Sequence, residues 1–304
     1  MDYEKHVQGL MERVPQCEVL TSVRMDGYTT FKIGGPVDLM IIPKSLDELR
    51  SVVLYLNEVE IPWMVLGNGS NLLVRDKGIR GAVLLIEKNM EEVNVQGCEI
   101  VASAGVLLSK LSKIIARQAL TGFEFASGIP GTLGGGIVMN AGAYDGEMKD
   151  VVTWVLTMDR EGNLHKYNSQ ESEFGYRHSR FQESDEIILS AGLTLHKGDP
   201  EAIDAKIREF TKLRTSKQPL DKGSAGSTFK RPTGYFAGKL IMDAGLSGYA
   251  VGDAQVSPKH CGFVVNNQGA SCQDVLTVIQ DVRDRVKSLY GVELETEIKI
   301  VGEE

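Results

Sequence analysis

The spacing of apolar positions along the chain predicts a protein that mixes helices and strands. Short apolar runs at 37–42 and 63–66 predict buried strands, and apolar residues three and four apart over 107–119 predict a helix. Ser45 and Glu48 have the capping-box spacing, which predicts the start of another helix between the two strands. The order strand, helix, strand, glycine loop is typical of α/β nucleotide-binding proteins.

The second half of the chain follows the same logic. The apolar runs of 151–167 flank a turn and predict a hairpin, and Asp199-Pro200 predicts a helix start whose apolar face ends near Arg214. The composition of 215–226 is polar and rich in Gly and Pro, so we place the main domain boundary there. A capping box and an apolar stripe predict a helix over 271–290, closed by a glycine.

The remaining patterns are weaker. Residues 1–23 have an irregular helical spacing and predict a packing arm without visible chemistry. Residues 292–301 alternate apolar and charged positions, which predicts a half-buried strand with an acidic face. Further strands are predicted at 72–86, 91–102, 187–195, 249–256 and 262–266, and a short helix at 235–245.

Composition narrows the class of protein. A chain of 304 residues predicts two or three domains, and 33 basic against 41 acidic residues argue against a broad nucleic-acid surface. No stretch has the leader or membrane-span pattern, so we expect a cytoplasmic protein without membrane insertion. The cysteines have no metal-ligand or redox spacing, and neither do the five histidines, so no metal site is expected. The cysteines are Cys17, Cys98, Cys261 and Cys272.

Two glycine-rich loops are the main candidates for ligand binding. They cover 67–72 (GNGSNL) and 122–146 (GFEFASGIPGTLGGGIVMNAGAYDG). Glycine lets a backbone approach a ligand closely and aim its N–H groups at an anion, although either loop alone is equally well explained as a turn. The pair fits a long diphosphate. Leu72 stands where a Rossmann fingerprint needs its third glycine, and no P-loop motif occurs, so those two classes are disfavoured.

Six motifs together carry a specific resemblance. They occur in the order GNGSNLLV, SGIPGTLGG with MNAGAYDGE, YRHSRF, SAGSTFKRP, KLIMDAGLSGYAVGDAQVSPKHCGFVVN and ELETEIKIVG. In this order they resemble the UDP-N-acetylenolpyruvoylglucosamine reductase (MurB) family, from about residue 29 to residue 302. No extra region is inserted between YRHSRF and SAGSTF, which resembles the shorter, type II form of the family.

The resemblance implies an α+β fold and a division into three parts. It implies a p-cresol methylhydroxylase (VAO)-type FAD-binding domain of two subdomains, 1–66 and 67–214, followed by a C-terminal α/β substrate-binding domain, 215–304. It also implies non-covalent FAD, with NADPH as co-substrate. By motif match, the cofactor-binding residues are Gly67, Asn68, Gly69, Ser70, Asn71, Leu72, Gly128, Ile129, Pro130, Gly131, Thr132, Asn140, Gly142, Ala143 and Arg214.

The activity that the resemblance implies is reduction of UDP-N-acetyl-3-O-(1-carboxyvinyl)-glucosamine to UDP-N-acetylmuramate, a step of peptidoglycan precursor synthesis. Arg177 matches the family's catalytic arginine, Ser227 its proton donor and Glu297 the third catalytic residue. Alternation alone does not distinguish Glu297 from Glu293 or Glu295. The implied substrate-binding residues are Tyr176, Lys230, Arg231 and Lys239.

Two other readings stay open on the residues alone. One is an FAD-dependent sugar or alcohol oxidase of the same cofactor fold, which has no need for the Ser227 and Glu297 motifs together. The other is a nucleotide-binding module without catalysis.

Arg180 is expected to be structural or to contact a phosphate.

Overall fold

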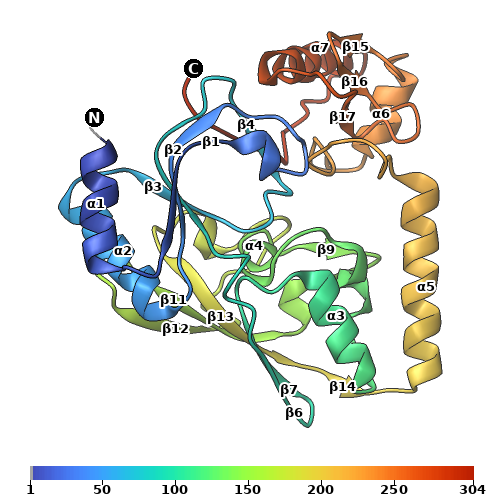
Figure 1. Cartoon of the computed structure of the whole chain (residues 1–304). Coiled ribbons are helices and arrows are strands. Elements are labelled where there is room, and N and C mark those ends of the chain that lie inside the picture. Colours follow the sequence, from blue (N-terminus) through green and yellow to red (C-terminus); the bar gives the residue numbers. More distant parts are fainter. Residues whose placement is uncertain (1–2) are drawn as a thin grey trace. The chain divides into compact units, whose positions relative to one another are not determined.

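The computed structural model describes residues 3–304 and divides the chain into two compact units (Figure 1). The division falls inside three neighbouring strands, so both units take part of the N-terminal half, and each is described by itself. Unit 1 comprises the residues up to Thr21, Leu39–Asn68 and Gly81–Arg214, and unit 2 comprises Ser22–Asp38, Gly69–Arg80 and Thr215–Glu304. The predicted three-domain division stays a prediction.

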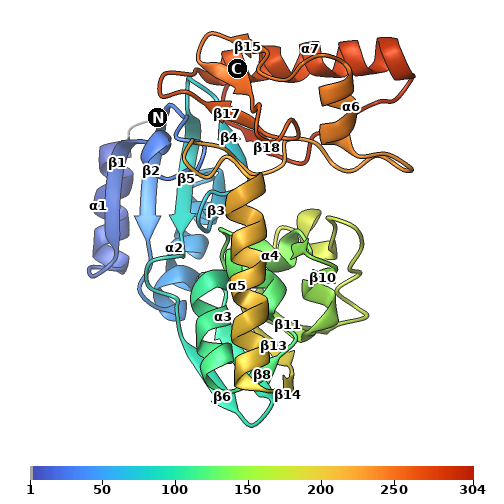
Figure 2. The same cartoon turned by 90° about the vertical axis from the view of Figure 1, so that its right-hand side faces the viewer.

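The strands shared by the units belong to a four-stranded sheet of order β1-β2-β5-β3, in which β3 and β5 are parallel. Figure 2 shows β1, β2 and β5 side by side. The predicted apolar runs form β2 and β3, and Pro43 directly follows β2. The bounds are β1 Glu18–Arg24, β2 Pro36–Ile42, β3 Trp63–Leu66 and β5 Ile79–Leu85.

In unit 1, α1 (Tyr3–Arg13) and α2 (Leu46–Glu58) pack with these strands around a core that includes Leu10, Leu49 and Leu84. The Ser45 hydroxyl caps α2 by accepting from the Glu48 N–H at 3.2 Å. The Glu48 carboxylate, however, accepts from the N–H of the residue before Ser45, at 2.7 Å, so the predicted box closes one residue early.

The second sheet of unit 1 is antiparallel, with the order β12-β11-β13-β7-β6. Helices α3 and α4 pack against it around a core that includes Leu111, Ile137, Val155 and Leu193. The predicted hairpin and the predicted helix at 107–119 are confirmed. The bounds are β6 Val93–Gln96, β7 Glu99–Ser103, β11 Val152–Met158, β12 Leu164–Asn168, β13 Ile187–Thr194, α3 Leu108–Arg117 and α4 Leu133–Val138.

Helix α5 (Pro200–Lys217) is tied to the glycine-rich stretch of unit 1 by one buried carboxylate. Glu124 is 3% exposed and accepts from the Thr121 hydroxyl at 2.6 Å and the Gly122 N–H at 2.9 Å. Lys206 of α5 lies 3.7 Å from it. The neighbouring short elements are β8 Leu120–Thr121, the 3₁₀ helix η2 Glu124–Gly128, β9 Gly142–Ala143, β10 Gly146–Glu147, η3 Met148–Asp150, η4 Arg180–Gln182 and β14 His196–Lys197.

Unit 2 packs α6 and α7 with a three-stranded sheet, β15-β16-β17, around its own core. The predicted capping box of Ser271 and Asp274 is confirmed, and Gly291 ends α7 with φ of +68°. Asp76 adds a second cap, because its carboxylate accepts from the first N–H groups of α7. The bounds are η1 Met25–Gly27, β4 Leu72–Val74, α6 Ala237–Asp243, β15 Ala250–Val251, β16 Ala254–Val256, β17 Val264–Asn266, α7 Cys272–Tyr290 and β18 Lys299–Val301.

Three expectations were wrong. The irregular N-terminal pattern is helical only over α1, and β1 follows it with a mostly exposed face that gives no clear alternation. Helix α5 continues past Arg214 to Lys217. Of the predicted C-terminal strand only β18 is extended in a sheet, and Ile300 is 37% exposed while Leu294 and Ile298, four residues apart, are buried.

Within residues 3–304 no helix combines the length and the apolar character needed to cross a membrane. The same residues contain no group of three or more His, Cys, Asp or Glu side chains placed to hold a metal ion. The four cysteines are free.

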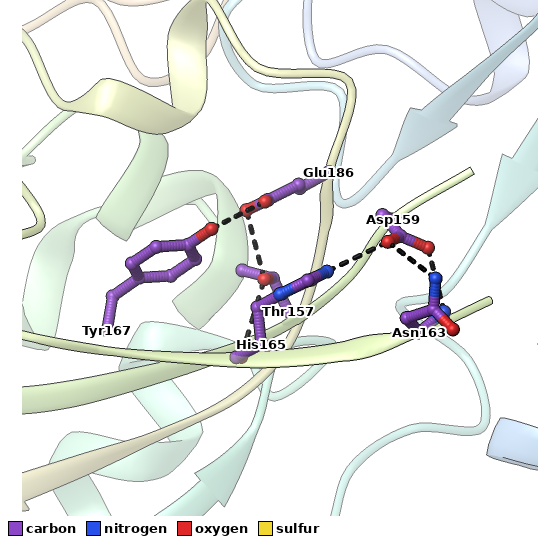
Figure 3. A network of polar contacts seen from close by, with 6 residues as sticks. All are labelled: Thr157, Asp159, Asn163, His165, Tyr167 and Glu186. Carbon is purple, nitrogen blue, oxygen red and sulfur yellow. Dashed lines mark hydrogen bonds and ion pairs between the residues drawn. The ribbon is translucent and has the colours of Figure 1, made fainter. Parts of the chain in front are cut away.

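A polar network crosses the β11–β12 hairpin of unit 1 (Figure 3). His165 Nε2 lies 2.8 Å from Asp159 Oδ2, and Asp159 also accepts from Asn163. Glu186 accepts from the hydroxyls of Thr157 and Tyr167. The Asp159 hydrogen bond raises the pKa of His165, and the same bond lowers the pKa of Asp159 to about 2.

The His165–Asp159 pair predicts a pH-dependent contribution to stability. The pair is fully charged between the ordinary pKa of Asp159, 3.8, and that of His165, 6.5. Its contribution is lost as the pH rises through the raised pKa of His165, or falls toward about 2. We expect His165→Gln to lower Tm most near pH 5 and least above neutral pH, measured by calorimetry. The predicted contribution of the pair is contradicted if the Tm difference between His165→Gln and wild type does not depend on pH. It is also contradicted if His165→Gln lowers Tm by the same amount in an Asp159→Asn background.

Candidate functional site

The predicted site residues are distributed over both units, and each group is built up within its own unit. The proximity of Arg177 to Ser227 and Glu297, which the family motifs imply, stays a prediction. Unit 1 holds Gly67, Asn68, Gly128, Ile129, Pro130, Gly131, Thr132, Asn140, Gly142, Ala143, Tyr176, Arg177 and Arg214, and unit 2 holds Gly69, Ser70, Asn71, Leu72, Ser227, Lys230, Arg231, Lys239 and Glu297.

The two glycine loops lie against each other in unit 1. The Asn68 amide donates to the Pro130 carbonyl at 2.5 Å, and a Cβ on Gly67 would clash with the Thr132 hydroxyl. A Cβ on Gly128 would lie 3.0 Å from Cδ of Arg214. Glycine at 67 and 128 therefore lets Thr132 and the Arg214 side chain approach the backbone closely. The predicted approach of these loops to a ligand stays a prediction.

The glycines of α4 serve a different purpose. The N–H groups of Leu133 and Gly134 donate to the carbonyls of Val106 and Ala104, both at 2.8 Å, and Thr132 caps the helix. A Cβ on Gly134 would lie 2.9 Å from the Cβ of Ala104. The first amides of α4 are thus used inside the protein, so an anion at this loop has to meet the backbone before the helix.

Arg214 brings an uncompensated positive charge to the Gly128 loop. No carboxylate of residues 3–304 forms an ion pair with it, and burial lowers the pKa of its guanidinium. Tyr144 holds α5 nearby: its ring stacks on Phe210 at 4.3 Å, and its hydroxyl donates to the Phe210 carbonyl at 3.1 Å. A partly buried cation without an acidic partner suits an anionic ligand.

Asn140 is placed differently from its predicted role. Its side chain is fully buried, donates to Glu147 and to the Gly175 carbonyl at 2.8 Å each, and accepts from the Lys149 N–H at 2.9 Å. Both donors and the carbonyl are in use, which gives this side chain a structural role. A cofactor contact of Asn140 stays a prediction.

Arg177 stands on a strained turn. Gly175 and His178 exchange backbone hydrogen bonds, and Arg177 between them has φ of +53°. Its guanidinium donates to the Gly142 carbonyl at 3.1 Å and lies 5.2 Å from the Tyr176 ring. A left-handed conformation costs a non-glycine residue about 1–2 kcal/mol, and such strain concentrates at functional sites.

Arg180, three residues on, has structural contacts. Its guanidinium lies 4.1 Å from the Tyr167 ring and donates to the Glu171 carbonyl at 3.2 Å. Of the two roles expected from the sequence, these contacts favour the structural one.

In unit 2, Thr228 fixes the two residues that match the family's proton donor and acid. Thr228 is fully buried, and its N–H donates to the Gly262 carbonyl at 2.8 Å. Its hydroxyl accepts from the Val264 N–H, and its carbonyl accepts from the Glu297 N–H, both at 2.9 Å. Ser227 directly precedes this anchor, and among residues 3–304 its hydroxyl has no hydrogen-bond partner.

The first glycine loop joins the same cluster. Asn71 donates from its amide to the Glu297 carbonyl at 3.2 Å and accepts at its own carbonyl from the Lys299 N–H at 2.9 Å. Strands β4 and β18 then run parallel, with Leu72 opposite Lys299. Three motifs that are far apart in the sequence therefore meet inside unit 2.

The extent of burial distinguishes Glu297 from Glu293 and Glu295, which the alternation of apolar and charged positions in the sequence could not do. Glu297 is half-buried, whereas Glu293 and Glu295 are exposed and pair with Lys287 at 2.6 Å and Lys230 at 3.3 Å.

The predicted substrate-binding cations lie on exposed surface of unit 2. Lys230 pairs with Glu295, and Lys239 pairs with Asp243 at 2.8 Å. Such pairs are weak, so a phosphate can replace the carboxylate at little cost. The Arg231 guanidinium lies 4.0 Å from the ring of Phe236, which is 59% exposed. Sequence reasoning missed Phe236, although an aromatic residue in a Gly- and Pro-rich loop was the available signal.

Family models match both parts of the chain. Residues 37–168 match the FAD binding domain, and residues 218–301 match the C-terminal domain of UDP-N-acetylenolpyruvoylglucosamine reductase. The protein of that name from Alkaliphilus oremlandii is 51% identical over the full length of both chains. The chain belongs to the UDP-N-acetylenolpyruvoylglucosamine reductase family.

Other relatives agree with this assignment. The family member from Caldanaerobacter subterraneus subsp. tengcongensis is 50% identical and covers 98% of each chain. The crystal structure of the reductase from Thermus caldophilus is 35% identical, with a TM-score of 0.80 over 94% of this chain and 98% of that one. The predicted order of an FAD-binding domain followed by the family's C-terminal domain is confirmed.

The anchor at Thr228 predicts a clear order of stability among variants. Thr228→Val removes the acceptor for the buried Val264 N–H, and we expect it to lower the free energy of unfolding by about 1–3 kcal/mol. Thr228→Ser keeps the acceptor and loses one methyl group, which costs about 1 kcal/mol. Urea denaturation followed by circular dichroism measures both. A loss in the serine variant equal to or larger than that in the valine variant contradicts this role of the hydroxyl.

Proposed function

We propose that this family member reduces the enolpyruvyl ether of its UDP-N-acetylglucosamine substrate to the lactyl ether, UDP-N-acetylmuramate, for peptidoglycan synthesis. The observation that carries the proposal is the 51% identity over the whole of both chains, with the FAD-binding and C-terminal domains both matched. We further propose that it is a type II member, that NADPH is the reductant, and that the enzyme works in the cytoplasm. The free cysteines are in keeping with a reducing compartment.

The residues of unit 1 fit FAD. A side chain at Gly67 would clash with Thr132 and one at Gly128 would crowd Arg214, and Arg214 supplies a positive charge that no carboxylate of residues 3–304 neutralises. An extended dinucleotide presents a diphosphate, which such a backbone cradle with one guanidinium can hold. When bound, FAD supplies the hydride chemistry, and the protein supplies binding, orientation and protons.

Arg177 is proposed to stabilise the charge that develops on the substrate. Reduction of the enolpyruvyl double bond places negative charge on the carbon next to the carboxylate. A guanidinium is permanently positive and can hold a carboxylate with two parallel hydrogen bonds. The strained turn keeps Arg177 at the apex of the loop, which suits a group that must be ready before the substrate arrives.

Ser227 is proposed to protonate that carbon. A serine hydroxyl is a weak acid, so it can do so only because the carbanion is a strong base. The hydroxyl is free of protein partners within residues 3–304, and Thr228 fixes the backbone directly after it. Glu297, held by the same anchor, is proposed to assist either as a protonated acid or by organising Arg177 and a water.

A Ser227→Ala variant tests the proton donor. We expect NADPH to reduce its flavin at the wild-type rate, because no proton from Ser227 is needed there, while reoxidation by the enolpyruvyl sugar is abolished. Anaerobic stopped-flow absorbance of the flavin measures the two half-reactions separately. Ser224→Ala, in the same loop, is the matched control and should keep both rates. Equal loss of both half-reactions in Ser227→Ala refutes the role.

An Arg177→Gly variant tests the charge without removing the turn. Glycine accepts a positive φ, so the variant should keep the turn and lose only the contacts of the guanidinium. We expect kcat/KM to fall by at least about 100-fold, as when one donor to a developing negative charge is removed. Arg177→Ala should show the same kinetic loss together with lower stability, by about 1 kcal/mol relative to the glycine variant. Near wild-type kcat/KM in the glycine variant excludes Arg177 from the chemistry.

A further inference from the structure

The tight loop between β16 and β17 contains a histidine that the proposed chemistry does not use. His260 is half-buried, and its Nδ1 accepts from the N–H of Gly262, two residues on, at 3.2 Å. A ring nitrogen that accepts this bond carries no proton, so the imidazole is neutral with its hydrogen on Nε2. The contact has the geometry of an Asx turn, in which a side chain accepts from the backbone two residues later.

The surroundings of the ring hold it in that position. The Phe263 ring meets it edge to face, with centroids 4.9 Å apart. A Cβ on Gly262 would lie 3.0 Å from Cε1 of the imidazole, and a Cβ on Gly238 of α6 would lie 3.4 Å from the same atom. Both glycines therefore make room for the ring, which packs between the loop and the start of α6.

His260 and Thr228 bind the two backbone groups of one residue, Gly262, and these groups lie in consecutive peptide units. The Gly262 N–H donates to His260, and the Gly262 carbonyl accepts from the Thr228 N–H at 2.8 Å. Thr228 in turn directly follows Ser227. Two hydrogen bonds, joined through the backbone of Gly262, and the Ser227–Thr228 peptide bond thus connect the imidazole to the hydroxyl proposed as proton donor.

We propose that His260 is a positioning residue for Ser227: the neutral imidazole fixes the Gly262 N–H, which restrains the backbone of that residue and with it the carbonyl that binds Thr228, and so aims the Ser227 hydroxyl. The inference rests on the proposed role of Ser227 and adds to it a residue that touches neither substrate nor cofactor. Protonation of Nδ1 replaces the acceptor by a second donor, which breaks the contact with the Gly262 N–H.

Burial and the neighbouring positive charges keep the His260 ring neutral. Burial is the main cause that lowers the pKa of His260 below its usual 6.5, and Lys217 at the end of α5 lowers it further. Lys259, next in the loop, donates to the Thr215 carbonyl at 2.7 Å, and on α6 Lys239 is paired with Asp243. The arrangement is therefore intact at neutral pH and is lost as the pH falls through the lowered pKa.

Three variants separate the acceptor from the bulk of the ring. In His260→Asn the amide oxygen takes the place of Nδ1 and can restore the turn. His260→Gln has a similar amide one bond further out, and His260→Phe keeps a ring without an acceptor. In anaerobic stopped-flow runs, we expect flavin reoxidation by the enolpyruvyl sugar to stay within about threefold of wild type in His260→Asn, and to fall about tenfold in His260→Gln and His260→Phe. Flavin reduction by NADPH should be unchanged in all three.

A pH series gives a readout that a purely structural role would not move. The ratio of wild-type to His260→Asn reoxidation rates should fall as the pH is lowered below 6.5, because asparagine does not titrate. This comparison also decides the matter if the Gln or Phe variant does not fold.

The outcomes are distinct. A His260→Asn variant as slow as the Gln variant, a flat ratio across pH, or an equal loss in both half-reactions overturns the positioning role. If the wild-type flavin is not reoxidised by the enolpyruvyl sugar at all, the proposed function fails instead. If Ser227→Ala is reoxidised normally, the role of Ser227 fails, and with it the purpose assigned to His260.

Discussion

The buried residue Thr228 is the constraint on which the C-terminal part of the site depends. Its N–H, hydroxyl and carbonyl each bond to a different segment: the loop after β16, strand β17 and the C-terminal stretch. None of these groups is in contact with water, so a segment that moves away leaves a buried polar group unpaired at a cost of about 1–3 kcal/mol. The positions of Ser227 and Glu297 are therefore set by one residue that has no proposed catalytic role of its own.

The parts of the fold that the sequence predicted share one property: each is specified by residues close in the chain. Capping residues and an apolar stripe defined α7 with both of its ends, and short apolar runs between turn residues defined β2 and β3. The C-terminal stretch failed because its geometry is imposed from outside. Glu297 and Lys299 take their backbone partners from Thr228 and Asn71, and no local pattern contains that information.

The glycines of the candidate site show the same limit of sequence reasoning, because their partners lie far away in the chain. The sequence indicated correctly that backbone approaches something closely, but not what. At 67 and 128 the neighbours are Thr132 and Arg214, whereas at 134 the neighbour is Ala104, inside the core. One glycine-rich stretch thus serves loop packing at its start and helix packing at its end. Only the first of these leaves backbone for a ligand.

The positively charged side chains proposed for catalysis and for substrate binding are held in two different ways. Arg177 lies on a turn that a non-glycine residue enters at an energetic cost, and its guanidinium donates to the Gly142 carbonyl. The cations of unit 2 are on the surface: Lys230 and Lys239 are paired with exposed carboxylates, and each such pair contributes little energy. A phosphate can therefore exchange with these surface carboxylates at little cost, whereas the turn that carries Arg177 is fixed by backbone hydrogen bonds between Gly175 and His178.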